Sequence, residues 1–216
     1  MQNPNISLFQ SKSSMTVKIA VLVSGRGSNL QAIIDSIEKG YIKNAAVSVV
    51  ISNKADAYAL ERAEKHGISA VFLDPEGRDR AGYDREILKI LKQYDTDLLL
   101  LAGYFRLLGS EIIEAYRHRI LNIHPSLLPA FKGLHAQKQA FEYGVKVAGC
   151  TVHFVDEGLD SGPIIIQKCV PVLPEDTEET LTARILEQEH IIYPEAVRLF
   201  VESKLKVEGR NVITLK

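Results

Sequence analysis

Apolar residues recur along this chain in two alternating patterns. The first is a nearly continuous run rich in β-branched residues at 17–24 (VKIAVLVS), which is typical of a strand buried on both faces of a parallel sheet. The second is a stripe with apolar residues three and four positions apart at 29–39, which indicates a helix ending before Gly40. Further strands are expected at 46–52, 70–73, 98–101 and 120–124, and further helices at 57–66, 83–94, 111–116 and 136–143.

The C-terminal part breaks this alternation. Two β-rich runs, 150–155 and 164–172, follow each other with a glycine-rich loop between them, which favours a strand pair added to the sheet. A long helix is expected at 180–201, and Pro194 should kink it or mark a break. The sequence therefore predicts an α/β fold in a single domain: a Rossmann-like, mostly parallel sheet with helices on both faces and a mixed C-terminal edge.

Length and composition agree with one globular domain. The 216 residues are 46% hydrophobic and 25% charged, and the net charge of -1 gives no reason to expect nucleic acid or an anionic membrane as a partner. The longest apolar stretches have strand length, so no membrane span is expected. Residues 1–14 lack the apolar segment of a secretory signal. We expect them to be a leader or disordered tail before a domain at 15–216, in a cytoplasmic protein.

The two cysteines, Cys150 and Cys169, lie in the two C-terminal β-rich runs. Neither has a second cysteine or a group of histidines at metal-ligand spacing. The sequence therefore predicts no metal site and two buried free thiols.

The most informative polar pair lies at the end of the run 120–124. Asn122 and His124 are two positions apart, and Pro125 ends the run. In a strand, this spacing places both side chains on one face at the C-terminal end, where open α/β sheets bind ligands. An amide can donate to a developing oxyanion and an imidazole can transfer a proton, so the pair suits acyl transfer. Taken alone, it also fits a turn-forming Asn beside a structural His.

A glycine-rich loop, SGRGSN at 24–29, connects the first expected strand to the first expected helix. Its glycines allow close approach of a ligand to the backbone, and the start of a helix attracts anions. The pattern lacks the third glycine of the dinucleotide fingerprint and the Gly-Lys-Ser/Thr of a P-loop. It favours a single phosphate on a small molecule, and a tight turn without a ligand is the alternative.

Six segments together carry a family resemblance. They are SGRGSNLQAIID (24–35), SNKADA (52–57), AGYFRLL (102–108), LNIHPSLLP (121–129), GLDSGPIIIQ (158–167) and QEHIIYP (188–194). With these motifs the chain resembles the phosphoribosylglycinamide formyltransferases of de novo purine synthesis, essentially from Met15 to Leu205. The Asn-x-His pair and the downstream Asp are shared by the wider group of formyl-tetrahydrofolate enzymes. The first and last motifs are more specific to the branch of this group that acts on glycinamide ribonucleotide.

The resemblance implies a reaction and its catalytic residues. The amine of glycinamide ribonucleotide would attack the formyl group of 10-formyltetrahydrofolate, the co-substrate, and form a tetrahedral intermediate with an oxyanion. Asn122, His124 and Asp160 would act on that centre. A carboxylate beside an imidazole favours the imidazolium, which can donate a proton or stabilise an oxyanion.

The resemblance also implies the binding residues. Those for the ribonucleotide are Gly27, Ser28, Asn29 and Glu189. Those for the folate are Arg80, Phe105, Arg106, Leu107, Leu108, Asn122, Asp156 and Leu159. His135 and His153 match family positions too, with either a supporting role or a purely structural one.

Two alternatives stay open at this point. One is a related enzyme with the same triad, either a methionyl-tRNA formyltransferase or a formyl-tetrahydrofolate hydrolase. The other is a non-catalytic phosphate-binding module, which would need the loop 24–29 but not the triad. Partners are expected to be small molecules, with neither nucleic acid nor membrane, and the protein to be a monomer or homodimer.

Overall fold

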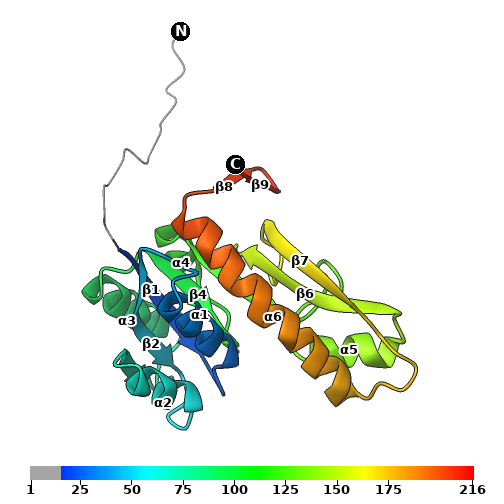
Figure 1. Ribbon diagram of the computed structural model, residues 1–216. Coiled ribbons are helices and arrows are strands. Elements are labelled where there is room, and N and C mark those ends of the chain that lie inside the picture. Colours follow the sequence, from blue (N-terminus) through cyan, green and yellow to red (C-terminus); the bar gives the residue numbers. More distant parts are fainter. Residues whose placement is uncertain (1–15) are drawn as a thin grey trace.

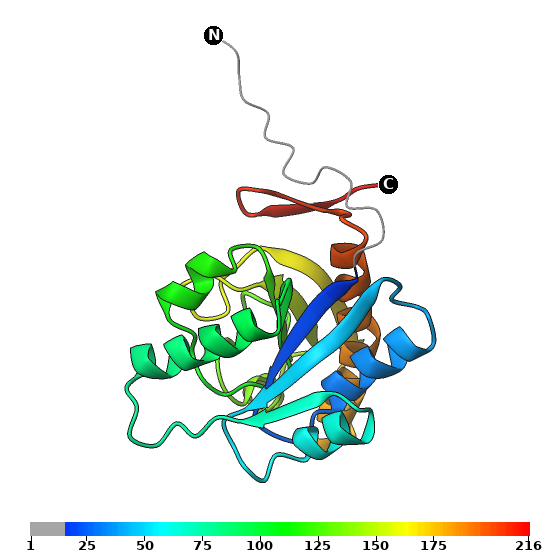
Figure 2. The same ribbon diagram turned by 90° about the vertical axis from the view of Figure 1, so that its left-hand side faces the viewer.

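The computed structural model describes residues 16–216, so the expected leader at 1–14 lies outside the described residues. Its centre is a seven-stranded sheet (Figures 1 and 2). The spatial order is β3 (Ser69–Phe72), β2 (Ala45–Ser52), β1 (Val17–Val23), β4 (Leu98–Leu101), β5 (Ile120–His124), β6 (Val147–Phe154) and β7 (Ile164–Pro171). The five strands from β3 to β5 in this order are parallel to one another. β6 pairs with β5 in antiparallel fashion, and β7 pairs with β6 in the same way. The predicted α/β fold with a mixed edge is confirmed.

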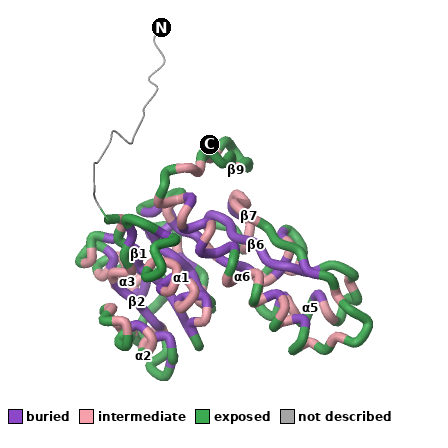
Figure 3. Tube along the Cα trace, in the orientation of Figure 1, coloured by how far each residue is buried: buried purple, intermediate pink, exposed green. Residues whose placement is uncertain are grey.

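Helices cover both faces of the sheet and bury its strands (Figures 1 and 3). One face packs against α1 (Ser28–Glu38), α2 (Tyr58–Lys65), α5 (Ala136–Tyr143) and α6 (Glu178–Val201), and the other against α3 (Arg80–Gln93) and α4 (Ser110–Ala115). In β1, Val21 belongs to the first core and the next residue, Leu22, to the second. Because both faces are covered, neighbouring residues of a strand are all buried, which explains the unbroken apolar runs.

The long helix α6 runs without interruption through Pro194, so the structure rules out a break there, and the alternative of a kink stays a prediction. A proline inside a helix removes one backbone hydrogen bond. Here Pro194 is itself buried, between residues such as Tyr193 and Val197 that pack into the core. Burial of this apolar face stabilises the helix on both sides of the proline and outweighs the missing bond.

A C-terminal hairpin was not predicted from the sequence. It consists of β8 (Leu205–Glu208) and β9 (Asn211–Thr214), joined by a two-residue turn in which Gly209 has a φ of 61°. Its strands, LKVE and NVIT, interleave polar residues and lack the unbroken apolar run of the equally short β4. The hairpin packs against the first core through Leu205, Val207 and Val212. It lies beyond the end of α6, near one end of β7 in Figure 1.

Tyr193 connects α6 to the part of the sheet that carries the Asn-x-His pair. Its ring is fully buried, and its hydroxyl oxygen lies 3.0 Å from the carbonyl oxygens of both Leu101 and Leu121. These carbonyls belong to β4 and β5. The hydroxyl therefore holds the helix and both strands in one arrangement just before β5 ends.

We predict that Tyr193→Phe lowers the free energy of unfolding by about 1–2 kcal/mol, because a buried hydrogen bond is lost while the ring volume is kept. For a chain of this length, the melting temperature should fall by about 2–4 °C for each kcal/mol. The matched control is Tyr143→Phe, at a side chain 79% exposed, which should leave the melting temperature unchanged. Equal melting temperatures for both variants and the parent protein would contradict the assignment.

Candidate active site

The strand order reverses between β1 and β4, which are neighbours in the sheet but not in the sequence. In open α/β sheets, loops diverge at such a point and leave a crevice for ligands. Ser24 organises this place. Its backbone N–H donates to the Gly103 carbonyl (2.9 Å), its hydroxyl donates to Asn53 Oδ1 (2.6 Å), and the hydroxyl accepts from the N–H of Phe105 (3.0 Å). One buried serine thus connects the loops after β1, β2 and β4.

The structure brings together the three residues that the resemblance implies for catalysis. Asn122 and His124 project from the end of β5 toward a loop after β6 that carries Asp160. Asp160 Oδ2 lies 3.3 Å from His124 Nδ1, and Asp160 Oδ1 lies 3.8 Å from His153 Nε2. Asn122 Nδ2 is 3.1 Å from the same His153 nitrogen. The four side chains form one polar cluster beside the sheet.

Both ring nitrogens of His124 face hydrogen-bond acceptors. Nε2 lies 2.8 Å from the carbonyl oxygen of Phe131, and Nδ1 faces the Asp160 carboxylate. A carbonyl and a carboxylate can only accept, so each nitrogen is best served by carrying a proton. The geometry therefore favours the imidazolium form of His124, although the ring is buried.

His153 fixes the orientation of the Asn122 amide. Its Nδ1 lies 2.7 Å from the Phe154 carbonyl oxygen and must donate to it. Burial lowers the pKa of His153, which favours the neutral ring with a bare Nε2. That nitrogen can only accept, so Asn122 must present its NH₂ group. One N–H of this group stays available to another acceptor.

The Asp160 loop, residues 156–162, is held in a tight conformation. Asp160 has a φ of 44°, in the left-handed region that few non-glycine residues adopt. Its Oδ2 also accepts from the N–H of Gly133 (2.8 Å). Asp156 Oδ1 accepts from Gly158 N–H (3.1 Å) and from the Ser161 hydroxyl (2.6 Å). Asp156, expected at the folate, thus shapes the loop that positions Asp160.

The glycine-rich loop 24–29 leads into α1, as expected, but its glycines have different roles. Gly27 has a φ of 70°, and a Cβ there would lie 2.7 Å from the Cβ of Ala59 in α2. The packing of α2 therefore explains Gly27, and approach of a ligand is not needed to account for it. A Cβ at Gly25 would meet no atom within 4 Å. Gly25 is the position of this loop that leaves room for a ligand.

Asn29 and Glu189 form a buried pair between α1 and α6. Asn29 Nδ2 donates to Glu189 Oε2 over 2.7 Å, across 160 positions of sequence. Burial raises the pKa of the Glu189 carboxyl. The oxygen of the same amide, Asn29 Oδ1, is buried and has no hydrogen-bond partner among the described residues. Ser28, the first residue of α1, directly precedes Asn29, so Ser28, Asn29 and Glu189 lie close together. The resemblance implies these three residues for binding of the ribonucleotide.

The residues implied for the folate are divided between exposed and packed positions. Phe105, Leu107 and Leu159 are exposed by 61%, 59% and 48%, which leaves three apolar side chains free to contact a ligand. Leu108 is buried in the second core. The Arg106 guanidinium lies 4.5 Å from the centre of the Tyr83 ring.

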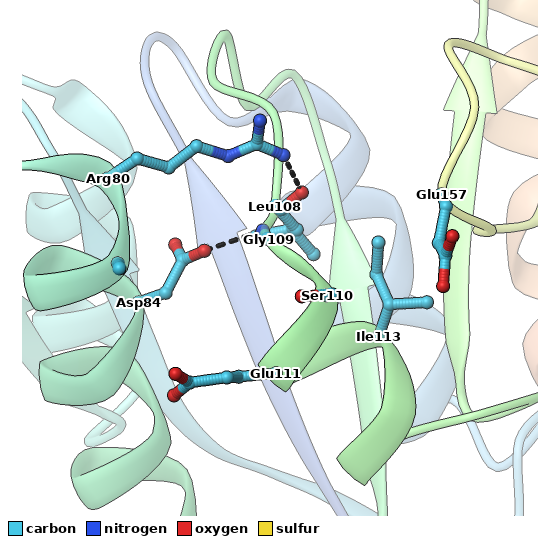
Figure 4. Close-up of a pocket in the computed structure, with 9 residues that line it drawn as sticks. Arg80, Asp84, Leu108, Gly109, Ser110, Glu111, Ile113 and Glu157 are labelled. Carbon is cyan, nitrogen blue, oxygen red and sulfur yellow. Dashed lines mark hydrogen bonds between the residues drawn. The ribbon is translucent and has the colours of Figure 1, made fainter.

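Arg80 donates a hydrogen bond to the Leu108 carbonyl and lines a groove of about 380 Å³ (Figure 4). Asp84 Oδ2 accepts from the N–H of Gly109 (2.5 Å) on the same wall, and burial raises the pKa of Asp84. Glu157 lies on the opposite wall, at the start of the Asp160 loop. The loop after β4 and the Asp160 loop therefore face one space.

Three partners of the cluster were not identified as such from the sequence. The Phe131 carbonyl and the Gly133 N–H are backbone groups, which carry no sequence signal. His153 was noted, but its contact with Asn122 depends on the antiparallel register of β5 and β6, in which the two residues are opposite. His135 is exposed at the N-terminal end of α5, and its ring makes no hydrogen bond or ion pair with the described residues of the cluster.

The cysteines fit the expectation only in part. Cys150 is buried and free, and burial raises its thiol pKa to about 12. Cys169 is free but exposed, so the expected burial is wrong there; it lies on β7, the edge strand of the sheet. Within residues 16–216 there is no group of three or more His, Cys, Asp or Glu side chains placed to hold a metal ion. No helix of that same part is both long and apolar enough to span a membrane.

Comparisons with known proteins agree with this geometry. Residues 17–197 match the family model described as formyl transferase. Phosphoribosylglycinamide formyltransferase of Escherichia coli (strain K12) is 47% identical over 192 residues, which are 88% of this chain and 90% of that protein. The crystal structure of glycinamide ribonucleotide transformylase 1 from Symbiobacterium toebii has a TM-score of 0.92 and 54% identity, covering 95% of this chain and 96% of that chain.

A longer relative contains the same part. The trifunctional purine biosynthetic protein adenosine-3 of Drosophila pseudoobscura pseudoobscura is 49% identical over 191 residues, but these make up only 14% of its length. The bacterial proteins are instead matched over nearly their whole length. This chain belongs to the phosphoribosylglycinamide formyltransferase family.

Proposed function

We propose that this chain transfers the formyl group of 10-formyltetrahydrofolate to the amine of glycinamide ribonucleotide. The observation that carries the proposal is the convergence of Asn122, His124 and Asp160 in one cluster. The family membership of the chain supports the same reaction. A phosphate-binding module without catalysis has no use for this cluster.

The proposed reaction proceeds through a tetrahedral intermediate. The amine attacks the formyl carbon, a new N–C bond forms, and the carbonyl oxygen becomes an oxyanion. The free N–H of Asn122 and the positive charge of His124 stabilise this oxyanion. The bond from carbon to folate N10 then breaks, the amine loses a proton and N10 gains one, so the charges balance.

The surroundings of His124 limit how it can act. Its Nε2 is engaged by Phe131 and its Nδ1 by Asp160. In this arrangement the imidazolium acts on the oxyanion through its charge. Direct proton donation from Nε2 requires the bond to the Phe131 carbonyl to open first.

The two substrates are proposed to approach from different loops. The ribonucleotide phosphate binds at Gly25–Asn29, at the start of α1, with Glu189 near its ribose or amine. The folate lies between Phe105–Leu108 and the Asp160 loop, with Arg80 at the edge. The exposed apolar side chains and the groove in Figure 4 support this assignment. The reaction needs no metal.

We further propose that residues 15–216 form the formyltransferase domain, that the protein is cytoplasmic, and that it is a monomer or homodimer. The start of β1 at Val17 and the start of the family match at the same residue support the domain boundary. Sedimentation of the full chain would establish the oligomeric state.

The change in ultraviolet absorbance as formyl-tetrahydrofolate is consumed tests the reaction directly. We expect consumption only when glycinamide ribonucleotide is present. Consumption without the ribonucleotide would show a hydrolase instead. Absence of consumption in both cases would leave the binding module as the better account.

We predict that His124→Ala lowers kcat by roughly 10²–10⁴-fold, the usual scale for a positioned acid or base. Asp160→Asn removes the charge that favours the imidazolium. As pH is raised, the variant should therefore lose activity at a lower pH than the parent protein does. Because both residues act on one transition state, the double variant should lose little more than His124→Ala alone. Rates that multiply in the double variant would show that Asp160 does not act through His124.

We predict that Gly25→Val raises the KM for the ribonucleotide by roughly tenfold or more, because the added side chain occupies the space of the phosphate. The melting temperature and the affinity for a folate analogue should change little, because Gly25 lacks a positive φ and has no atom within 4 Å of its Cβ position. Gly27→Ala is the contrasting variant and should lower the melting temperature, because its Cβ meets Ala59. Equal weakening of both ligands in Gly25→Val would place the phosphate elsewhere.

A further inference from the structure

The C-terminal hairpin reaches the loop that carries Asp160. The Arg210 guanidinium donates from Nη2 to the carbonyl oxygen of Ser161 over 2.8 Å, across 49 positions of sequence. Ser161 directly follows Asp160. Within the described residues, this hydrogen bond connects the turn of the hairpin to the Asp160 loop.

We propose that Arg210 is a positioning residue that holds the Asp160 loop so that the Asp160 carboxylate faces His124. This inference rests on the proposed function, because it gives Asp160 its role in catalysis. Arg210 itself does not touch the reacting atoms. It acts from the outer side of the loop, through the peptide that joins Ser161 to Gly162.

The Asp160 loop depends on fixed points at several places. Asp160 has positive φ, a conformation that persists only where the surroundings determine it. Behind the loop, Gly162 is pressed against β6, since a Cβ there would lie 1.8 Å from the Phe154 carbonyl oxygen. Within the loop, Asp156 binds Gly158 and Ser161. Arg210 adds a fixed point that comes from a separate element.

The hairpin is well suited to hold Arg210 in place. Its turn consists of Gly209 and Arg210 only, closed by the pairing of Glu208 with Asn211. Such two-residue turns have a defined backbone conformation. Val207 and Val212 pair one step before the turn, and their packing against the core holds the hairpin close to Arg210. The guanidinium therefore starts from a defined backbone position, and its charge strengthens the bond to the carbonyl.

The hairpin lies beyond residues 17–197, the part that matches the family model. The catalytic cluster lies within that part. The support of Asp160 by Arg210 is thus a contribution of the C-terminal hairpin to a site built by the common domain.

Steady-state kinetics of the full chain test the proposal with Arg210→Met, which keeps the apolar stem and removes the donors. We expect kcat to fall about tenfold, the scale of a slightly misplaced catalytic group, while the KM for the ribonucleotide stays constant. The basic limb of the pH profile of kcat should move to lower pH, since a displaced carboxylate stabilises the imidazolium less. Arg210→Lys should restore part of kcat, because an ammonium can also donate to a carbonyl.

The matched control is Lys206→Met on the same hairpin. Lys206 pairs with Glu208 at 2.7 Å and makes no hydrogen bond or ion pair with the Asp160 loop in the described structure, so the kinetics of Lys206→Met should equal those of the parent protein. All rates are measured well below the melting temperature of each variant. Equal losses in Lys206→Met and Arg210→Met would overturn the proposal, because the effect would then belong to the hairpin as a whole.

A double variant separates this inference from the proposed function. In an Asp160→Asn background, Arg210→Met should lower kcat by less than about twofold, because the charge that it positions is already absent. Full multiplication of the two losses would overturn the inference. If Asp160→Asn is impaired while Arg210→Met is not, only the role of Arg210 fails. If Asp160→Asn itself retains full activity, the catalytic role of Asp160 fails and the inference fails with it.

Discussion

The contact between the Asp160 carboxylate and the His124 imidazole is the interaction on which the site depends. It joins a strand end to a loop that follows a different strand, over 3.3 Å. An imidazolium buried without this partner would carry an uncompensated charge, which is costly in a protein interior. The Phe131 carbonyl and the Gly133 N–H complete the arrangement, one on the ring and one on the carboxylate. Together these contacts connect the loop after β5, which carries Phe131 and Gly133, to the Asp160 loop after β6.

The sheet explains why these loops meet. β5 is the last parallel strand, and β6 pairs with it in the opposite direction. The antiparallel register places His153 of β6 opposite Asn122 of β5, so that the His153 ring can orient the Asn122 amide. The connection from β6 to β7 then returns over the strand end with Asp160. A fully parallel sheet would have put a crossover helix where this loop lies.

Much of the fold followed from the sequence, because continuous apolar runs and helical stripes report burial directly. Residues 120–124 and 136–143 were predicted with the bounds that the structure has. The hairpin β8–β9 was missed because its strands, LKVE and NVIT, contain polar and exposed residues, whereas the equally short β4 is an unbroken apolar run. At the site, Asn122 and His124 were found by their spacing. Asp160 needed the family resemblance, and the reason for Gly27 required knowledge of its neighbour Ala59.

The burial of Glu189 bears on the proposed phosphate site at the start of α1. The N-terminal end of a helix attracts anions, which is why a phosphate is proposed to bind there. A full negative charge on Glu189 would repel that phosphate. Burial raises the pKa of Glu189, so the carboxyl keeps its proton more readily than an exposed one. The hydrogen bond from Asn29 works in the opposite direction, but burial is the larger effect. Burial of Glu189 in α6 thus reduces the repulsion that this carboxyl would exert on the proposed phosphate.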